Sequence, residues 1–209
     1  MTGEWKDVTI EEIASKVAMG PFGSDIKTDN FVPDGVPIIR GGNLTDGFVD
    51  SGFVYLTEAK ADELKNANAF PGDLVITHRG TLGQVGLIPQ SARYRRYVVS
   101  QSQLLIRPSV DRVASHLLYL FLTSHLGQNM LLANRSQTGV PAIAKPTASV
   151  KAIELTIPAS PVGDSFESIA SGVFALMTHL NNESRKLAEM RDYLLPKLLS
   201  GQVAVEVQP

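Results

Sequence analysis

Arginine is concentrated in the middle of this 209-residue sequence, where clustered guanidinium groups have the chemistry to bind phosphates or the hydrogen-bonding edges of bases. Residues 1–73 carry a net charge of −7 and residues 154–209 a net charge of −3, whereas residues 74–153 carry nine basic side chains against the single acid Asp111. The overall charge of −2 therefore conceals a cation-rich block with a net charge of +8. The basic residues of this block are Arg79, Arg93, Arg95, Arg96, Arg107, Arg112, Arg135, Lys145 and Lys151.

Aromatic, amide and hydroxyl side chains accompany these cations. The segment Arg93-Tyr94-Arg95-Arg96-Tyr97 alternates rings with guanidinium groups, and Gln101, Ser102, Gln103 and Gln137 follow it. Amides and hydroxyls can hydrogen-bond to base edges in the major groove of DNA. The combination indicates a nucleic-acid-binding surface, although a heparin-like polyanion or an acidic protein surface also suits this composition.

Catalytic and metal-binding patterns are weak by comparison. The sequence has no cysteine, no phosphate-binding loop and no dinucleotide fingerprint. The four histidines, His78, His116, His125 and His179, lack the spacing of metal ligands. A small hydrolase built around His78 is the enzymatic alternative, but no nucleophile-elbow motif supports it. We therefore expect a binding protein with no metal and no cofactor.

The composition is typical of a globular chain, with 44% hydrophobic and 19% charged residues. No apolar run approaches the roughly 18 residues that a membrane span needs, so we expect no membrane partner. The N-terminus contains Glu4, Trp5 and Asp7 instead of a basic and then apolar signal peptide. We therefore expect a cytoplasmic location.

The elements that must position these side chains indicate a mixed α/β domain over residues 1–160. A capping box formed by Thr9 and Glu12, followed by an apolar stripe, predicts a helix over 9–17. The glycine-rich segment 20–52 predicts loops with short strands near 37–40 and 53–55. Further strands are expected at 74–77, 84–88, 97–99, 103–106 and 155–157. The helical regions expected are 57–68 and 111–135, the second with a break near Gly127, and residues 138–146 are expected to form a loop.

The C-terminal region, residues 161–209, predicts a long helix of the coiled-coil type. A helix from an N-cap at Asp164 to Leu195, where Pro196 is expected to stop it, would be about 48 Å long. This length exceeds the width of a small domain, so the apolar stripe is expected to pack against a partner helix. The stripe is interrupted only by Glu183 and consists of Phe166, Ile169, Val173, Leu176, Leu180, Leu187, Met190 and Leu194.

Three segments resemble the specificity subunits of type I restriction-modification systems. The first runs from Gly20-Pro-Phe-Gly-Ser-Asp-Ile-Lys27 to Gly35-Val-Pro-Ile-Ile-Arg-Gly-Gly-Asn-Leu44 and is similar to the opening of the family's target recognition domain. The second, Pro71-Gly-Asp-Leu-Val-Ile-Thr-His-Arg-Gly-Thr-Leu-Gly83, resembles its central strand and turn. The third, Arg191-Asp-Tyr-Leu-Leu-Pro-Lys-Leu-Leu-Ser-Gly201, resembles the end of its spacer helix.

The resemblance implies a mixed α/β target recognition domain that binds double-stranded DNA and is joined to a long helix. It also implies a subunit without catalysis of its own, which places a methyltransferase subunit and a restriction subunit on one bipartite site. Usual members carry two recognition domains and two helices, so this sequence resembles half a subunit. A homodimer through the C-terminal helix would restore two recognition domains, and the antiparallel helices of the family then imply an inverted-repeat target.

Strand-end residues beside glycine are the expected base-contacting group: His78 and Arg79 in one turn, Arg40 and Asn43 in another. A second group is expected to contribute phosphate or base contacts: Lys27, Arg93, Tyr94, Arg95, Arg96, Gln101, Ser102, Arg135, Gln137 and Lys145. The alternative to DNA recognition is a coiled-coil scaffold protein whose cationic block binds an acidic partner.

Overall fold

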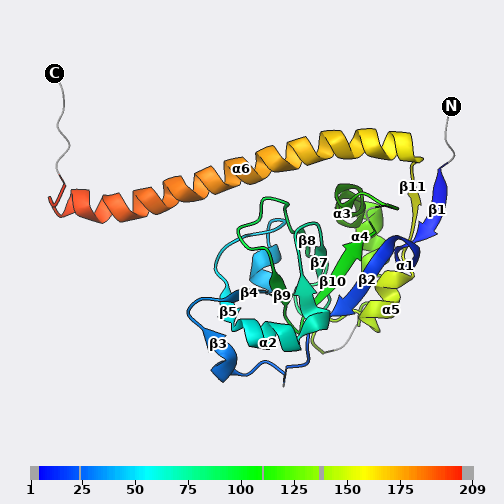
Figure 1. Ribbon diagram of the computed structural model, residues 1–209, viewed down its shortest axis with the longest axis horizontal. Helices are drawn as coiled ribbons and strands as arrows, with labels where there is room; N and C mark the ends of the chain where they lie inside the picture. Colours follow the sequence, from blue (N-terminus) through cyan, green and yellow to red (C-terminus); the bar gives the residue numbers. More distant parts are fainter. Residues whose placement is uncertain (1–4, 24, 110, 137–138, 204–209) are drawn as a thin grey trace. The chain divides into compact units, whose positions relative to one another are not determined.

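A computed structural model describes residues 5–23, 25–109, 111–136 and 139–203 of the chain. The chain divides into two compact units, Met1–Ala170 and Ser171–Pro209. The first unit is a mixed α/β domain and the second contains most of a long helix (Figure 1). Both features agree with the fold class expected from the sequence, while the functional boundary at residue 160 remains a prediction.

Eleven strands form three sheets within the described residues of the first unit. The four-stranded sheet has the order β2-β10-β7-β8, and its pairs are antiparallel. The five-stranded sheet has the order β3-β5-β4-β9-β6, in which β4 and β9 run parallel. Strands β1 and β11 form a separate antiparallel pair. The strands are β1 (Lys6–Thr9), β2 (Ala14–Met19), β3 (Phe31–Val32), β4 (Val36–Ile39), β5 (Val54–Leu56), β6 (Asn68–Ala69), β7 (Leu74–Thr77), β8 (Val85–Leu87), β9 (Tyr97–Val99), β10 (Gln103–Pro108) and β11 (Glu154–Ile157).

The helices of the chain include several short ones and one long one. The α-helices are α1 (Ile10–Ile13), α2 (Glu58–Glu63), α3 (Ser115–Thr123), α4 (His125–Leu132), α5 (Pro146–Lys151) and α6 (Ser160–Leu199). The 3₁₀ turns are η1 (Thr28–Asn30), η2 (Gly41–Leu44) and η3 (Lys65–Ala67). Among the residues that the structure describes, none of these helices combines the length and apolar character of a membrane span.

Strands β7 and β10 lie between two hydrophobic cores because successive side chains of a strand point to opposite faces. Leu74, Ile76 and Leu104 pack in one core with residues of α3, α4 and α5. Val75 and Leu105 pack in the other core, with side chains of the five-stranded sheet. Burial of both faces explains why these strands are continuous apolar runs in the sequence. The expected strands at 74–77, 84–88, 97–99, 103–106 and 155–157 are confirmed.

The helix expected over residues 9–17 is wrong beyond its first turn. The predicted capping box is present, since the Glu12 amide donates to Thr9 Oγ1 and the Thr9 amide donates to Glu12 Oε2. Helix α1 nevertheless ends at Ile13, and residues 14–19 continue as β2. Strand β2 pairs antiparallel with β10, where Val17 lies opposite Ile106. The pairing energy of this strand outweighs the weak helical preference of a short apolar stripe.

Two other helix predictions also need correction. The break in the 111–135 region falls at Ser124, whose side chain caps α4, whereas Gly127 lies inside α4. A Cβ at Gly127 would lie 2.0 Å from the Phe121 carbonyl oxygen, so this glycine allows close packing of α4 on the end of α3. A further helix, α5 (Pro146–Lys151), was not predicted, and it begins at the last residue of the loop expected at 138–146.

Helix α6 is longer than predicted at both ends. It begins at Ser160 instead of after Asp164, because Pro161 lies in the first turn, where the missing amide hydrogen is not needed. It also continues through Pro196 to Leu199. The proline removes one backbone donor, but later bonds still form, as the Ser200 amide donates to the Pro196 carbonyl.

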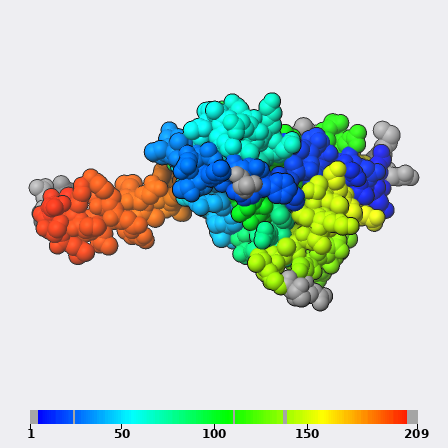
Figure 2. All heavy atoms as spheres, turned by 90° about the horizontal axis from the view of Figure 1, so that it is seen from below, coloured from blue at the N-terminus to red at the C-terminus, as the bar shows by residue number. Residues whose placement is uncertain are grey.

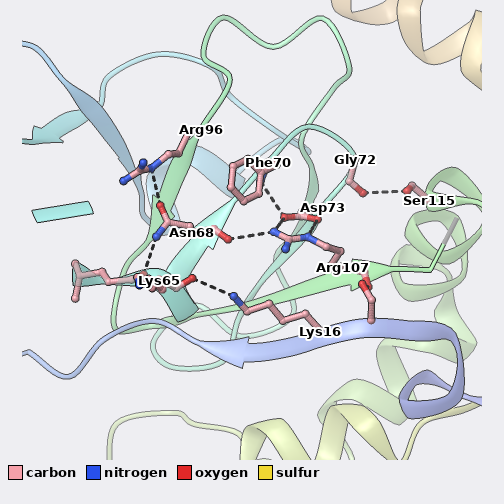
Figure 3. Close-up of polar contacts among 11 residues, drawn as sticks. Lys16, Lys65, Asn68, Phe70, Gly72, Asp73, Arg96, Arg107 and Ser115 are labelled. Carbon is pink, nitrogen blue, oxygen red and sulfur yellow. Dashed lines mark hydrogen bonds and ion pairs between the residues drawn. The ribbon is translucent and has the colours of Figure 1, made fainter. Parts of the chain in front are cut away.

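A polar network ties β6, β7 and β10 together (Figure 3). Arg107 on β10 donates to both carboxylate oxygens of Asp73, at 2.9 and 2.7 Å, and also to the carbonyl oxygen of Asn68. Its guanidinium carbon lies 4.9 Å from the centre of the Phe70 ring. The Asp73 side chain is only 4% exposed, so Arg107 neutralises a buried charge.

We predict that Arg107→Ala will destabilise the domain by about 2 to 4 kcal/mol, because it leaves the buried Asp73 carboxylate without its ion-pair partner. Urea unfolding measures the effect. Arg95→Ala, at an exposed arginine of the same block, serves as the control and should change stability by less than about 0.5 kcal/mol. Equal stability of the two variants would contradict the role assigned to Arg107.

Candidate functional site

The ends of four strands meet on one side of the domain. Because β4 and β9 are parallel, Arg40 and Ser100, which follow them, are neighbours, and the Ser100 amide donates to the Ile39 carbonyl at 3.0 Å. The His78 amide after β7 donates to the Ser102 carbonyl, and the Gly20 amide after β2 donates to the Gln103 carbonyl. We call this surface, formed by residues 20–23, 25–27, 40–42, 78–80, 100–102, 135–136 and 139–145, the strand-end face. In Figure 2 blue segments that follow β2 lie beside green and yellow-green segments of the chain.

A network of neutral polar side chains lies under the strand-end face. The Thr77 hydroxyl donates to Gln84 Oε1 at 2.9 Å, and Gln103 Nε2 donates to Thr77 Oγ1 at 3.3 Å. The Ser100 hydroxyl donates to the other end of the Gln103 amide. Gln103 is 1% exposed, so it orders the strand ends instead of facing a ligand. A satisfied network of this kind fixes loop geometry.

His78 belongs to this supporting layer. Its side chain is buried, and Nε2 donates to the Gln101 carbonyl oxygen at 3.2 Å. Burial lowers the pKa of His78 below its ordinary value, so the imidazole is neutral at pH 7. Because Nε2 is engaged by backbone, this geometry gives no support to a hydrolase with His78 as general base. The histidine holds the 100–102 turn in place.

Cations from distant parts of the sequence lie on the strand-end face. Arg79 forms an antiparallel bridge with Ala142, and Arg135 forms one with Ile143. The Ile143 amide donates to the His78 carbonyl at 2.9 Å, which ties the 139–145 segment to the β7 end. The exposed basic side chains on this face are Lys27, Arg40, Arg79, Arg135 and Lys145, and they are joined by the exposed Gln101 and the half-buried Ser102.

The segment 93–96 lies at the opposite end of β9 from Ser100. Tyr94 packs in a cluster with Phe53, Tyr55 and Tyr97, and its hydroxyl bonds to that of Tyr55 at 3.1 Å. Burial, followed by the bond to Tyr55, raises the pKa of Tyr94 to about 12. We expected the cationic block to form one surface. The structure instead places its exposed arginines in two groups, one on the strand-end face and one at the opposite end of β9. Arg93 and Arg95 are exposed at the second end.

Four of the nine cations in the block pair with acidic or backbone groups of the first unit. Arg96 lies 2.8 Å from Asp62 and also donates to Asn68 Oδ1. Arg112 donates to the Glu12 carbonyl, and Lys151 pairs with Glu11 at 2.9 Å. Arg107, described above, is the fourth. Of the expected DNA-contacting residues, this places Arg96 in a structural role.

Asn43 is also removed from the surface. It is 4% exposed, its Oδ1 accepts the Arg40 amide at 3.0 Å, and its Nδ2 donates to the carbonyls of Val49 and Ser51. The side chain therefore shapes the loop after β4, and we leave it out of the proposed contact surface. Gln137, also expected to contact DNA, lies outside the described residues.

A pocket that the sequence did not predict lies at one edge of the strand-end face. Its volume is about 190 Å³, and its walls include Phe22, Ile26, Phe31, Ile38, Arg40 and Gln101. The signal in the sequence was the pair of glycines around Phe22. A Cβ at Gly20 would lie 1.9 Å from the Ser100 carbonyl oxygen, so only glycine lets the loop approach the 100–102 turn this closely.

The apolar stripe of α6 is exposed, as expected of a partner-binding helix. Ile169, Leu176 and Leu187 are 71%, 59% and 65% exposed, while Phe166 is half-buried. The remaining exposed members are Val173, Leu180, Met190 and Leu194. Within the described residues, no group of three or more histidine, aspartate or glutamate side chains is arranged to hold a metal ion.

Comparison with known proteins matches this fold to one family. The model of the type I restriction modification DNA specificity domain matches residues 2–189. A crystal structure of a type I restriction-modification S subunit from M. genitalium is 16% identical, with a TM-score of 0.63, and the match covers 94% of this chain and 46% of that one. The HsdS subunit from Thermoanaerobacter tengcongensis is 16% identical, with a TM-score of 0.52 over 92% of this chain and 44% of that one.

A third match comes from a study of complex assembly and conformational transition of the type I R-M system. It is 18% identical, with a TM-score of 0.55 over 94% of this chain and 46% of that one. At such identities the structural likeness shows the fold alone, and the chain spans less than half the length of each of these structures. No curated protein matches the sequence significantly.

We predict that Gly20→Ala will destabilise the domain by about 1 to 3 kcal/mol, because its Cβ meets the backbone of Ser100. Gly42→Ala is the matched control, since a Cβ at Gly42 has nothing within 4 Å. Urea unfolding of both variants tests the fit between the loop and the 100–102 turn. If the Gly20 variant is as stable as the Gly42 variant, the two segments do not pack as described.

Proposed function

The chain belongs to the family of type I restriction-modification DNA specificity domains, because the family model covers residues 2–189, and we propose that it recognises a DNA sequence through the strand-end face. The observation that carries this proposal is the convergence of exposed arginines and a glutamine on strand ends held by buried polar bonds. Arg40, Arg79 and Arg135 bring the bidentate fork that suits a guanine edge or a phosphate. Gln101 brings the amide that suits adenine.

Arg93 and Arg95 have a different role in the proposal. They lie at the other end of β9, where Arg93 stacks over the Tyr94 ring with 5.4 Å between the guanidinium carbon and the ring centre. Tyr94 is held within its aromatic cluster, so it supports Arg93 and does not itself stack on bases. We assign these two arginines to phosphate contacts, which set position and affinity without selecting the sequence.

We further propose that the chain is a non-catalytic specificity subunit without a cofactor. In this role it positions a methyltransferase subunit and a restriction subunit of the same system on double-stranded DNA. The sequence supports this division of labour because it lacks nucleotide-binding and nucleophile motifs. A cytoplasmic location remains a prediction of the sequence.

The helix α6 supplies the proposed dimer contact. Its apolar stripe repeats at alternating three- and four-residue spacing, which is the pattern of a two-helix seam. Glu183 occupies one seam position and lies 3.5 Å from His179 on the preceding turn. The resemblance to type I specificity subunits implies that the paired helices run antiparallel. A two-fold pair of this kind implies an inverted-repeat target with a gap of fixed length.

Selection of bound duplexes from random DNA tests the proposed function directly. The purified chain, together with a methyltransferase subunit, should enrich an inverted repeat with a fixed spacing. Enrichment of no sequence would contradict DNA recognition. If binding to DNA is absent and an acidic protein binds instead, the scaffold alternative is favoured.

We predict that Arg79→Ala will weaken binding to the selected duplex by roughly 5- to 150-fold, or about 1 to 3 kcal/mol, if the side chain contacts a base. The loss should be smaller on a scrambled duplex, because phosphate contacts do not depend on sequence. Lys151→Ala, at a lysine paired with Glu11, is the control and should bind normally. Fluorescence anisotropy measures the affinities of the wild-type chain and both variants for the two duplexes. Equal losses on both duplexes would move Arg79 to the phosphate-contacting group.

We predict that Leu176→Glu will raise the dissociation constant of the dimer by at least about tenfold, because it places a charge in the seam. Ala175→Glu introduces the same charge at the neighbouring exposed position, which faces away from the seam, and should leave the dimer intact. Sedimentation velocity over a concentration series gives both constants. A monomeric wild-type chain, or identical behaviour of the two variants, would remove the proposed dimer contact.

A further inference from the structure

The pocket beside the strand-end face combines flat apolar walls with polar groups on one side. Phe22, Ile26, Phe31 and Ile38 supply the apolar walls, while Arg40 and Gln101 supply hydrogen-bonding groups. None of the lining residues is acidic in the part of the chain that the structure describes. Such a lining suits a planar ring with a polar edge.

The aromatic wall of this pocket is exposed and held in place. Phe22 is 75% exposed, which leaves a large apolar side chain in water next to a set of cations. Its amide donates to Asp25 Oδ2 at 3.0 Å, and the Asp25 amide donates back to the Phe22 carbonyl at 2.9 Å. A Cβ at Gly23 would lie 2.4 Å from Gln101 Oε1, so this glycine, like Gly20, seats the loop against the 100–102 turn. The loop therefore presents Phe22 in a defined position.

The volume of the pocket indicates which chemical group of DNA would fill it. A cavity of about 150 Å³ holds a benzene molecule in another protein, so about 190 Å³ accommodates a ring of nucleobase size. A thymine methyl group on a paired base would leave most of the space empty. The pocket lies next to Arg40 on the face proposed to bind DNA. A bound, negatively charged DNA strand would therefore pass the opening of the pocket.

We propose that the pocket accepts one base that is unstacked from the bound duplex, with Phe22 and Phe31 against its ring and Arg40 and Gln101 at its polar edge. This inference rests on the proposed function and adds to it a base-sized binding site within the specificity chain. Extruding a base costs unstacking and unpairing energy, which falls when the base is already unpaired. Contact of the ring with aromatic and apolar side chains offsets that cost.

The test removes the partner of each base in turn. Duplexes carrying the selected sequence are prepared with an abasic site opposite each successive position, so that the base on the probed strand is unchanged but unpaired. For the wild-type protein, we expect one position in each half-site at which binding tightens by roughly tenfold relative to the fully paired duplex.

Two variants and one control assign this effect to the pocket. Phe22→Ala removes the exposed wall, and Val54→Phe fills the pocket from another lining residue. In both, the tightening should fall below about twofold. Leu126→Ala, at an exposed leucine of α4, should retain the full effect. Thermal unfolding checks that each variant is folded.

The outcomes separate the two proposals. If the wild-type chain binds the selected duplex but no abasic position tightens binding, or if the tightening survives in both pocket variants, the base-binding pocket is refuted while the proposed function stands. If the wild-type chain selects and binds no duplex at all, the proposed function fails and the pocket proposal fails with it.

Discussion

The register between β7 and β10 is the constraint on which the rest of the domain depends. At one end of this strand pair, Arg107 neutralises Asp73 and also bonds to the Asn68 carbonyl. At the other end, Gln103 bonds to Thr77, and the strand ends carry the 78–80 and 100–102 turns. A slip of one residue would turn every side chain of the strand to the opposite face and unpair both ends. The register of this strand pair thus sets the positions of the turns that carry the surface arginines.

The fold also explains why the basic surface is smaller than the distribution of charge along the sequence indicated. The first 73 residues are acidic and the middle block is basic, so the two regions complement each other within the domain. Glu11, Asp62 and Asp73 are close partners of Lys151, Arg96 and Arg107. Other cations of the block, including Arg79, Arg93, Arg95, Arg135 and Lys145, remain exposed. Charge counts along a sequence cannot make this distinction, since each pairing joins residues far apart in the chain.

The sequence predicted elements well where one interaction dominated. Strands β7 to β10 were predicted because burial on both faces gives unmistakable apolar runs, and α6 was predicted because its stripe is long. Strand β2 was predicted as helix because Ile10, Ile13 and Val17 have helical spacing, whereas the pairing of β2 with β10 joins residues far apart in the sequence. The glycines around Phe22 indicate a close approach of the backbone, but the pocket itself was not predictable, because residues 21–23, 26, 31, 38, 40, 54, 100 and 101 line it together. Similarly, the sequence around Asn43 does not reveal whether its side chain faces solvent or bonds to loop carbonyls, so its burial was not predictable.

The neutral layer under the strand-end face has a consequence for conditions inside a cell. Thr77, Gln84, Ser100 and Gln103 do not ionise near neutral pH, and burial keeps the His78 imidazole uncharged. The surface charge comes from guanidinium groups, which keep their proton at any physiological pH, and from lysine ammonium groups. Mild acidification would therefore leave the charge of these cations unchanged, and burial opposes protonation of His78. Affinity for a polyanion would be governed by ionic strength and not by proton concentration.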